Sequence, residues 1–99
     1  MDIIKKIEGT TLTVALTERL DTVTSPQLEG ELRTAMNGVT ELFFDLAGLE
    51  YISSAGLRVL LSTQKVMNKQ GKMTIRNVKP EIMEIFEATG FVDILNIEE

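Results

Sequence analysis

The sequence contains no cysteine, no histidine and no tryptophan. Without cysteine or histidine there can be no disulfide framework, no Cys/His zinc site and no imidazole that acts as an acid or base. Any catalysis would therefore have to rest on carboxylates, lysines or hydroxyl groups. This composition disfavours an enzyme, and we expect neither a bound metal nor a cofactor.

Long hydrophobic runs are also missing, and the apolar runs that exist are too short to cross a bilayer. Residues 1–8 alternate apolar and charged side chains, whereas a signal peptide has an unbroken apolar stretch. The net charge is −5, from 10 basic and 15 acidic residues, which disfavours binding to nucleic acid or to an anionic membrane surface. We therefore expect a cytoplasmic protein with no direct nucleic-acid contact and no membrane insertion.

Acidic and basic residues are distributed unevenly along the chain. Residues 1–50 hold four basic and nine acidic residues, residues 51–79 hold six basic and no acidic residue, and residues 80–99 hold six acidic and no basic residue. Solvated faces of opposite sign explain this pattern without any partner. The alternative is that the basic stretch faces an acidic partner.

The hydrophobic pattern alternates strands and helices, and it predicts a single α/β domain over residues 1–99. Two β-branched segments on either side of Gly9 predict a hairpin, while Thr24 and Gln27 have the spacing of a helix-starting capping box. This β-β-α-β-α-β-α-β order predicts a mixed, mostly parallel sheet with helices packed against it. The predicted strands are residues 3–7, 11–16, 41–46 and 72–76, and residues 92–97 are predicted to be a final strand or extended edge. The predicted helices begin at Thr24, Ser54 and Pro80.

The junction between the predicted strand 41–46 and the longest helix is the most informative segment, because partner and ligand sites of α/β sheets lie at such junctions. Ser53 or Ser54 can cap the helix, which stabilises it by about 1 kcal/mol. Gly56 costs about 1 kcal/mol relative to alanine, so it indicates close packing on a strand or close approach of a partner. The spacing of Gly48 and Gly56 fits neither a P-loop nor a dinucleotide-binding fingerprint.

Six short pieces of the sequence form a recognisable pattern. They are Asp45-Leu46, Leu49-Glu50-Tyr51-Ile52, Ser53-Ser54-Ala55-Gly56-Leu57, Arg19-Leu20-Asp21, Gly71-Lys72 and Phe86…Thr89-Gly90-Phe91…Ile94. Together they resemble the signature of STAS domains, specifically of bacterial anti-sigma factor antagonists, over nearly the whole chain. Two positions depart from that signature: Ser53 replaces the usual aspartate, and Thr17-Glu18 replaces the usual glycine.

The resemblance implies a regulatory binding protein. An unphosphorylated antagonist captures an anti-sigma factor that is also a serine kinase, and this capture releases a sigma factor. Phosphorylation of the antagonist ends the capture, and a serine phosphatase is the further partner that the cycle implies. The acceptor serine of the family corresponds to Ser54, and Ser53 is a competing acceptor. We expect the partner to contact Asp21, Ser53, Ser54, Ala55, Gly56 and Arg58.

Two alternatives stay open beside this prediction. A STAS domain can instead be the accessory subunit of a transporter ATPase or of another multi-protein signalling complex. An enzyme with Ser54 as its nucleophile would need a lysine as base, and no lysine follows Ser54 at the Ser-x-x-Lys spacing. The basic stretch from Arg58 to Lys79 suits a kinase with an acidic surface or with bound ATP, and it equally suits plain solubility.

Overall fold

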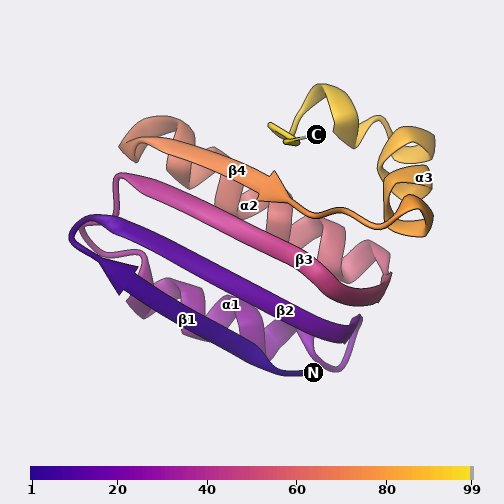
Figure 1. The fold of residues 1–99 in the computed structure, drawn as a ribbon, viewed down its shortest axis with the longest axis horizontal. Helices are drawn as coiled ribbons and strands as arrows, with labels where there is room; N and C mark the ends of the chain where they lie inside the picture. Colours follow the sequence, from indigo (N-terminus) through magenta and orange to yellow (C-terminus); the bar gives the residue numbers. More distant parts are fainter. Residues whose placement is uncertain (99) are drawn as a thin grey trace.

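The structure, a computed structural model, describes residues 1–98 of the chain (Figure 1). It confirms a mixed sheet with helices packed against it. In chain order the elements are β1 (Ile3–Glu8), β2 (Thr11–Leu20), α1 (Ser25–Ala35), β3 (Glu41–Ile52), α2 (Ser54–Gln70), β4 (Lys72–Arg76), α3 (Pro80–Thr89) and a 3-10 turn (Phe91–Asp93).

The four strands form one sheet in the order β1-β2-β3-β4. The predicted hairpin is confirmed: β1 and β2 are antiparallel and meet at Gly9, whose φ of 64° glycine adopts without strain. β2, β3 and β4 run parallel, so β2 and β3 end at the same edge of the sheet. Because β2 leads into α1 and β3 leads into α2, both helices begin at that edge (Figure 1).

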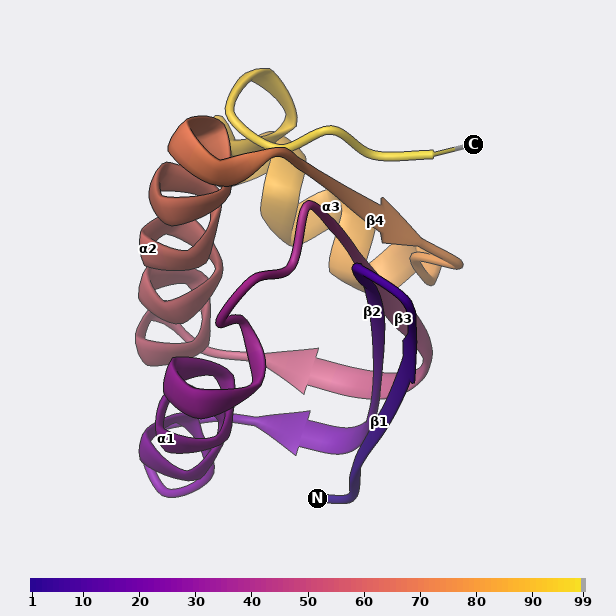
Figure 2. The same ribbon diagram turned by 90° about the vertical axis from the view of Figure 1, so that its left-hand side faces the viewer.

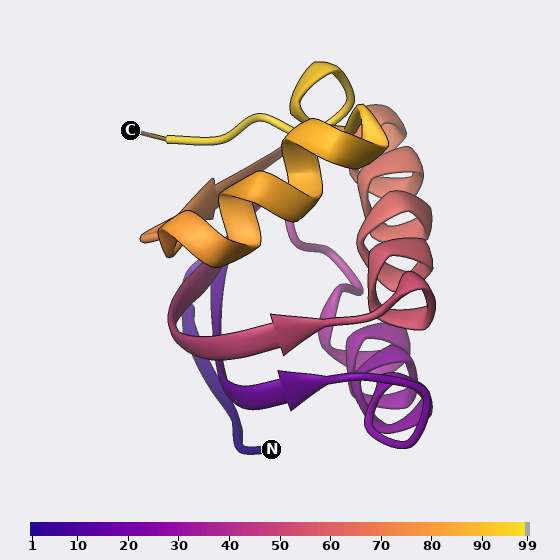
Figure 3. The same ribbon diagram turned by 90° about the vertical axis from the view of Figure 1, so that its right-hand side faces the viewer.

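One face of the sheet is covered by α1 and α2, which lie side by side (Figure 2). Alternate residues of the central strands point into this layer, and Leu12 and Phe44 are among those with 0% exposure. Each such side chain contributes about 1.5–3 kcal/mol through the surface that it removes from water. α3 instead packs against β3 at the end of the sheet, through its buried residues Ile82 and Phe86 (Figure 3).

Two strands are longer than the sequence predicts. The predicted strands 11–16 and 41–46 continue to Leu20 and Ile52, so most of the expected connection before α2 is strand. The ladder between β2 and β3 shifts register twice near residues 15–19, and such bulges bend a strand. The bend turns both strand ends toward the helical layer (Figure 3) and breaks the simple alternation on which the prediction rested.

The predicted final strand at residues 92–97 is wrong in most of its length. Gly90 adopts a left-handed conformation with φ 79° and ends α3, and the chain then turns through Phe91–Asp93 as a 3-10 helix. Only Ile97 pairs with β4, as an isolated parallel bridge to Ile75. The turn is favoured because it buries Leu95, which is 5% exposed.

Gln70, the last residue of α2, links this helix to the end of α1. Its side-chain amide donates to the backbone oxygen of Met36 at 2.6 Å and to that of Val39 at 2.5 Å. Met36 is the C-cap residue of α1 and Val39 lies in the segment that follows it, so the amide bonds the end of α2 to the chain at and just beyond the end of α1. The contact also sets the spacing of the two helices at this end.

We expect Gln70→Ala to lower the free energy of unfolding by about 1–3 kcal/mol, because it removes the side-chain donor of the Val39 carbonyl and leaves the Met36 carbonyl with only the Val39 N–H. Urea denaturation measures the change. Gln27→Ala is the matched control, since Gln27 is exposed on α1 and its amide reaches only Glu31, at 3.4 Å. The control should change stability by less than about 0.5 kcal/mol. Equal small effects of both substitutions would contradict the linking role of Gln70.

Candidate functional site

The candidate site lies where β2 and β3 end and α2 begins. The backbone N–H of Ser53 donates to the backbone oxygen of Leu20, the last residue of β2, at 2.9 Å. This bond holds the residue after Leu20 beside the start of α2. The six predicted contact residues therefore lie around the first turn of one helix: Asp21, Ser53, Ser54, Ala55, Gly56 and Arg58.

The two serines have different environments. Ser53 is the N-cap residue, with extended backbone at φ −98° and ψ 176°. Its hydroxyl oxygen is buried without a hydrogen-bond partner in the described part of the chain, so the cap bond considered from the sequence is not formed. Ser54 is the first helical residue and is exposed. The arrangement thus presents one hydroxyl to solvent and leaves the first N–H groups of α2 without a side-chain cap.

Gly56 packs inward, against the ends of both strands. A Cβ atom at this position would lie 2.8 Å from Cγ of Leu20, 2.8 Å from Cγ1 of Ile52 and 2.9 Å from the Leu20 backbone oxygen. Real Cβ contacts are longer than these distances, so only glycine allows α2 to begin this close to the sheet. Of the two interpretations of Gly56, the structure bears out close packing on a strand.

Arg58 follows Ser54 by one helical turn and is exposed. No ion pair engages it in the part of the chain that the structure describes. The first turn of α2 contains no acidic residue. The surface around Ser54 therefore combines the positive end of a helix with a free guanidinium group.

Asp21 is engaged within its own loop. Its Oδ1 accepts from the backbone N–H groups of Val23 at 3.0 Å and Thr24 at 3.1 Å, and its Oδ2 accepts from Arg19 at 3.4 Å. The Thr24 N–H bond, which outweighs the effect of desolvation, lowers the pKa of Asp21 from its ordinary 3.8. The predicted Thr24–Gln27 capping box is not formed, because the Thr24 hydroxyl accepts from the Asp21 N–H at 2.9 Å.

Three exposed residues beside the site, Arg19, Tyr51 and Val23, were not among the predicted contact residues. The guanidinium group of Arg19 lies 4.2 Å from the centre of the Tyr51 ring, and Tyr51 is 38% exposed. Val23, in the Asp21 loop, is 83% exposed. Arg19 and Tyr51 become partners only through the shifted ladder, so no local pattern could reveal the pair. Exposed aromatic and arginine side chains of this kind are typical of protein interfaces.

The described residues include no cluster of three or more acidic side chains that could hold a metal ion. No helix among them is long and apolar enough to span a membrane.

Comparison with known proteins identifies the family. The family model of the STAS domain matches residues 2–99. A protein of Bordetella bronchiseptica provisionally named anti-sigma factor antagonist BtrV is 37% identical over 94 residues, which cover 93% of this chain and 80% of that protein. The anti-sigma-B factor antagonist of Staphylococcus aureus is 34% identical over 83 residues, covering 81% and 76%. The chain belongs to the STAS domain family.

Solved structures share the fold at lower sequence identity. An anti-sigma factor antagonist from Mycobacterium paratuberculosis superposes with a TM-score of 0.87 at 21% identity, covering 97% of this chain and 83% of that one. The Bacillus cell fate determinant SpoIIAA in its phosphorylated form superposes with a TM-score of 0.77 at 18% identity, covering 99% and 92%. The predicted STAS-like fold is therefore confirmed.

We expect Gly56→Ala to destabilise the protein by about 1–3 kcal/mol, because the added methyl group overpacks the contact with Leu20 and Ile52. This cost outweighs the gain of about 1 kcal/mol in helix propensity. Gly30→Ala in α1 is the matched control: nothing lies within 4 Å of its Cβ position, so this substitution should stabilise by up to about 1 kcal/mol. Melting curves that move in the same direction for both variants would argue against the close-packing role.

The lowered pKa of Asp21 predicts a pH dependence of stability. Its ionised form is favoured in the folded state, so its contribution is complete above the unfolded pKa of about 3.9 and is lost as pH falls through the lower folded value. Between about pH 5 and pH 2, urea denaturation should show a smaller loss of stability for Asp21→Asn than for the unsubstituted protein. Asp93→Asn, at an exposed carboxylate with no hydrogen bond within residues 1–98, should keep the original pH dependence.

Proposed function

We propose that this chain is an anti-sigma factor antagonist whose binding is switched off by phosphorylation of Ser54. The unphosphorylated form binds an anti-sigma factor that is also a serine kinase, and a sigma factor is thereby released. The observation that carries the proposal is the exposed hydroxyl at the first residue of α2, in a chain whose named relatives are antagonists. Its place of action is the cytoplasm, where sigma factors bind RNA polymerase.

Accessibility supports Ser54 over Ser53 as the acceptor. A kinase must reach the hydroxyl oxygen with its bound ATP, and the Ser53 oxygen is buried. Ser54 lies on the outer surface of the first turn, and its hydroxyl makes no hydrogen bond within the described residues. Phosphorylation of Ser53 would first require its hydroxyl oxygen to become exposed, whereas the exposed Ser54 requires no such rearrangement.

The electrostatics of the first turn favour the modified form. A phosphate adds about −1.5 to −2 charge and three acceptor oxygens. A helix N-terminus stabilises an anion by about 0.3–1 kcal/mol at an exposed position, and Arg58 is within reach one turn further along. The phosphorylated protein should therefore stay folded. The switch acts on binding because an interface centred on Ser54 would have to bury a dianion.

The surface around Ser54 suits a protein partner. Tyr51, with Arg19 stacked on it, and Val23 lie on the strand and loop that flank the start of α2. Aromatic, arginine and aliphatic side chains in such a patch supply most of the affinity of protein interfaces. The proposed partners are the anti-sigma factor kinase, which adds the phosphate, and a serine phosphatase, which removes it.

The test uses the full chain, an anti-sigma kinase encoded in the same genome, and ATP. We expect mass spectrometry to locate one phosphate at Ser54, and we expect Ser54→Ala to abolish it while capture of the kinase persists. Ser54→Asp should weaken capture at least tenfold, which corresponds to 1.4 kcal/mol, with a melting temperature within about 4 °C of the original.

Ser53→Ala is the control for the neighbouring position, and it should leave both capture and phosphorylation in place. A phosphate found on Ser53, or undiminished capture by Ser54→Asp, would refute the switch. Failure of the unmodified protein to bind any such kinase would refute the antagonist assignment itself.

A further inference from the structure

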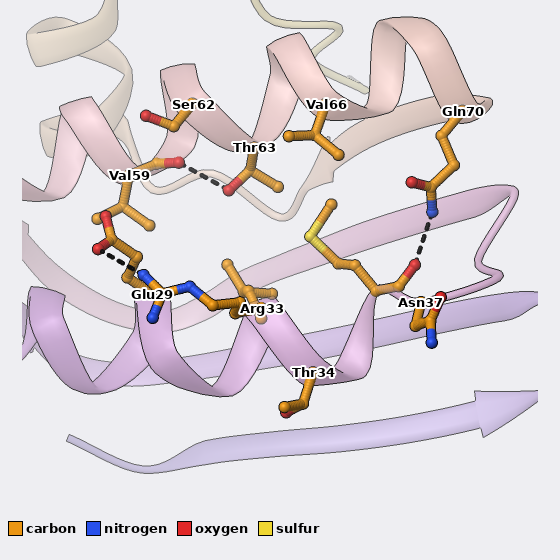
Figure 4. A pocket seen from close by; sticks show the side chains of 11 residues that line it. Glu29, Arg33, Thr34, Asn37, Val59, Ser62, Thr63, Val66 and Gln70 are labelled. Atoms are coloured by element: carbon orange, nitrogen blue, oxygen red, sulfur yellow. Dashed lines mark hydrogen bonds and ion pairs between the residues drawn. The ribbon is translucent and has the colours of Figure 1, made fainter.

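A groove runs between α1 and α2, away from Ser54 (Figure 4). Its volume is about 680 Å³, and both helices contribute side chains to it. Leu32, Met36 and Val59 form its apolar floor and are less than 10% exposed, while Val66 on its α2 side is 47% exposed. An apolar surface of this shape can hold the apolar side chains of another helix.

Contacts inside the protein hold the groove in shape. Gln70 closes one end by bonding to the backbone of Met36 at 2.6 Å (Figure 4). Arg33 and Glu29 form an ion pair at 3.4 Å on the α1 side. In the floor the Thr63 hydroxyl already donates to the Val59 backbone oxygen at 2.7 Å. A ligand that covers Thr63 would therefore not leave its hydroxyl without a hydrogen bond. Because these contacts already hold the side chains of the groove, binding would order few of them further.

The α2 side of the groove is positively charged. A smaller hollow lined by Lys65, Val66, Lys69 and Gln70 continues the groove and shares Val66 and Gln70 with it. Lys65 and Lys69 are exposed, and neither forms an ion pair within residues 1–98. α2 contains no acidic residue at all. Free positive charges beside an apolar groove favour a partner that brings carboxylates and apolar side chains together.

We propose that this groove is a second docking site, which binds an acidic amphipathic helix of a protein partner. The apolar side of that helix lies on Leu32, Met36 and Val59, and its carboxylates face Lys65 and Lys69. From Val59 to Gln70 the groove is about 16 Å long at 1.5 Å per residue, which matches about three turns of a bound helix.

The second site is independent of the switch at Ser54. Lys65 follows Ser54 by eleven positions in α2, or about 16 Å of helix. This separation exceeds the screening length of about 8–10 Å at physiological salt, so a charge added at Ser54 has little effect at Lys65. The proposal for the groove therefore does not rest on the antagonist function.

The test uses the full chain and a fluorescein-labelled synthetic peptide of about 15 residues, a length at which an isolated helix is marginally stable. The peptide carries leucine at positions i, i+3, i+4 and i+7 and glutamate on the flanks. A second peptide with lysine in place of each glutamate is the charge control. Fluorescence anisotropy should show binding of the acidic peptide and at least tenfold weaker binding of the basic one, and binding should weaken between about 0.05 and 0.5 M salt.

The variants separate the groove from general charge effects. Lys65→Glu combined with Lys69→Glu should weaken binding at least tenfold. Lys6→Glu combined with Lys72→Glu changes the net charge equally at exposed strand positions and should leave binding unchanged, as should Ser54→Asp. Amide shifts induced by the peptide should fall on residues 28–37 and 59–70.

Three outcomes would overturn the proposal. They are equal binding of the two peptides, equal effects of the two double variants, and amide shifts confined to the face of the sheet that α1 and α2 do not cover. Concentration-dependent dimerisation that is lost in the Lys65/Lys69 variant would assign the groove to a second copy of this chain instead, and sedimentation velocity measures it.

Discussion

The close contact between the first turn of α2 and the ends of β2 and β3 is the constraint on which the rest of the site depends. Gly56 has no side chain, so Leu20 and Ile52 fill the space beneath the helix. The backbone N–H of Ser53 also donates a hydrogen bond to the backbone oxygen of Leu20. One face of this first helical turn therefore packs against the sheet. Ser54 is left on the other face, where a partner can reach it. A larger residue at position 56 would clash with Leu20 and Ile52, so the first turn could not stay this close to the sheet.

The opposite end of α2 is also bonded to its surroundings, by Gln70 to the backbone oxygens of Met36 and Val39 at and just beyond the end of α1. A helix held at both ends is a rigid support, and this determines what kind of switch it can carry. In the proposed switch, a phosphate on Ser54 need not move any element, because its charge alone would make the surface unsuitable for burial against a partner. A switch of this type keeps the stability of the fold separate from the affinity for the partner.

The parts of this structure that local chemistry determines could be predicted from the sequence, and the parts that depend on distant contacts could not. The helix starting at Ser54 and the hairpin at Gly9 follow from spacing and turn residues that lie within a few positions of each other. The longer strand ends depend on a shifted ladder between residues far apart in the chain, and the same shift pairs Arg19 with Tyr51. In the site, the role of Ser54 was predicted only through the resemblance to STAS domains, while helical periodicity alone placed Arg58 one turn after it. The hydrogen bonds that Asp21 makes within its own loop could not be predicted. The Thr24 hydroxyl could bond either within a capping box with Gln27 or to the N–H of Asp21, and the sequence does not decide between the two.

The uneven distribution of charge along the sequence becomes a basic surface on α2 in the structure. The chain has a net charge of −5, yet the 29 residues from Tyr51 to Lys79 carry only positive charges, and three of these, Arg58, Lys65 and Lys69, lie exposed along one helix. These charges favour the approach of an acidic surface of a partner to α2. The distance of each basic residue from Ser54 decides how much a phosphate there would affect it. Arg58 lies about 6 Å along the helix from Ser54, within the screening length, and a phosphate of −1.5 to −2 more than cancels its charge. Lys65 and Lys69 lie beyond the screening length and keep their attraction. A single modification can thus close the end of the helix to one partner while its side stays open to another.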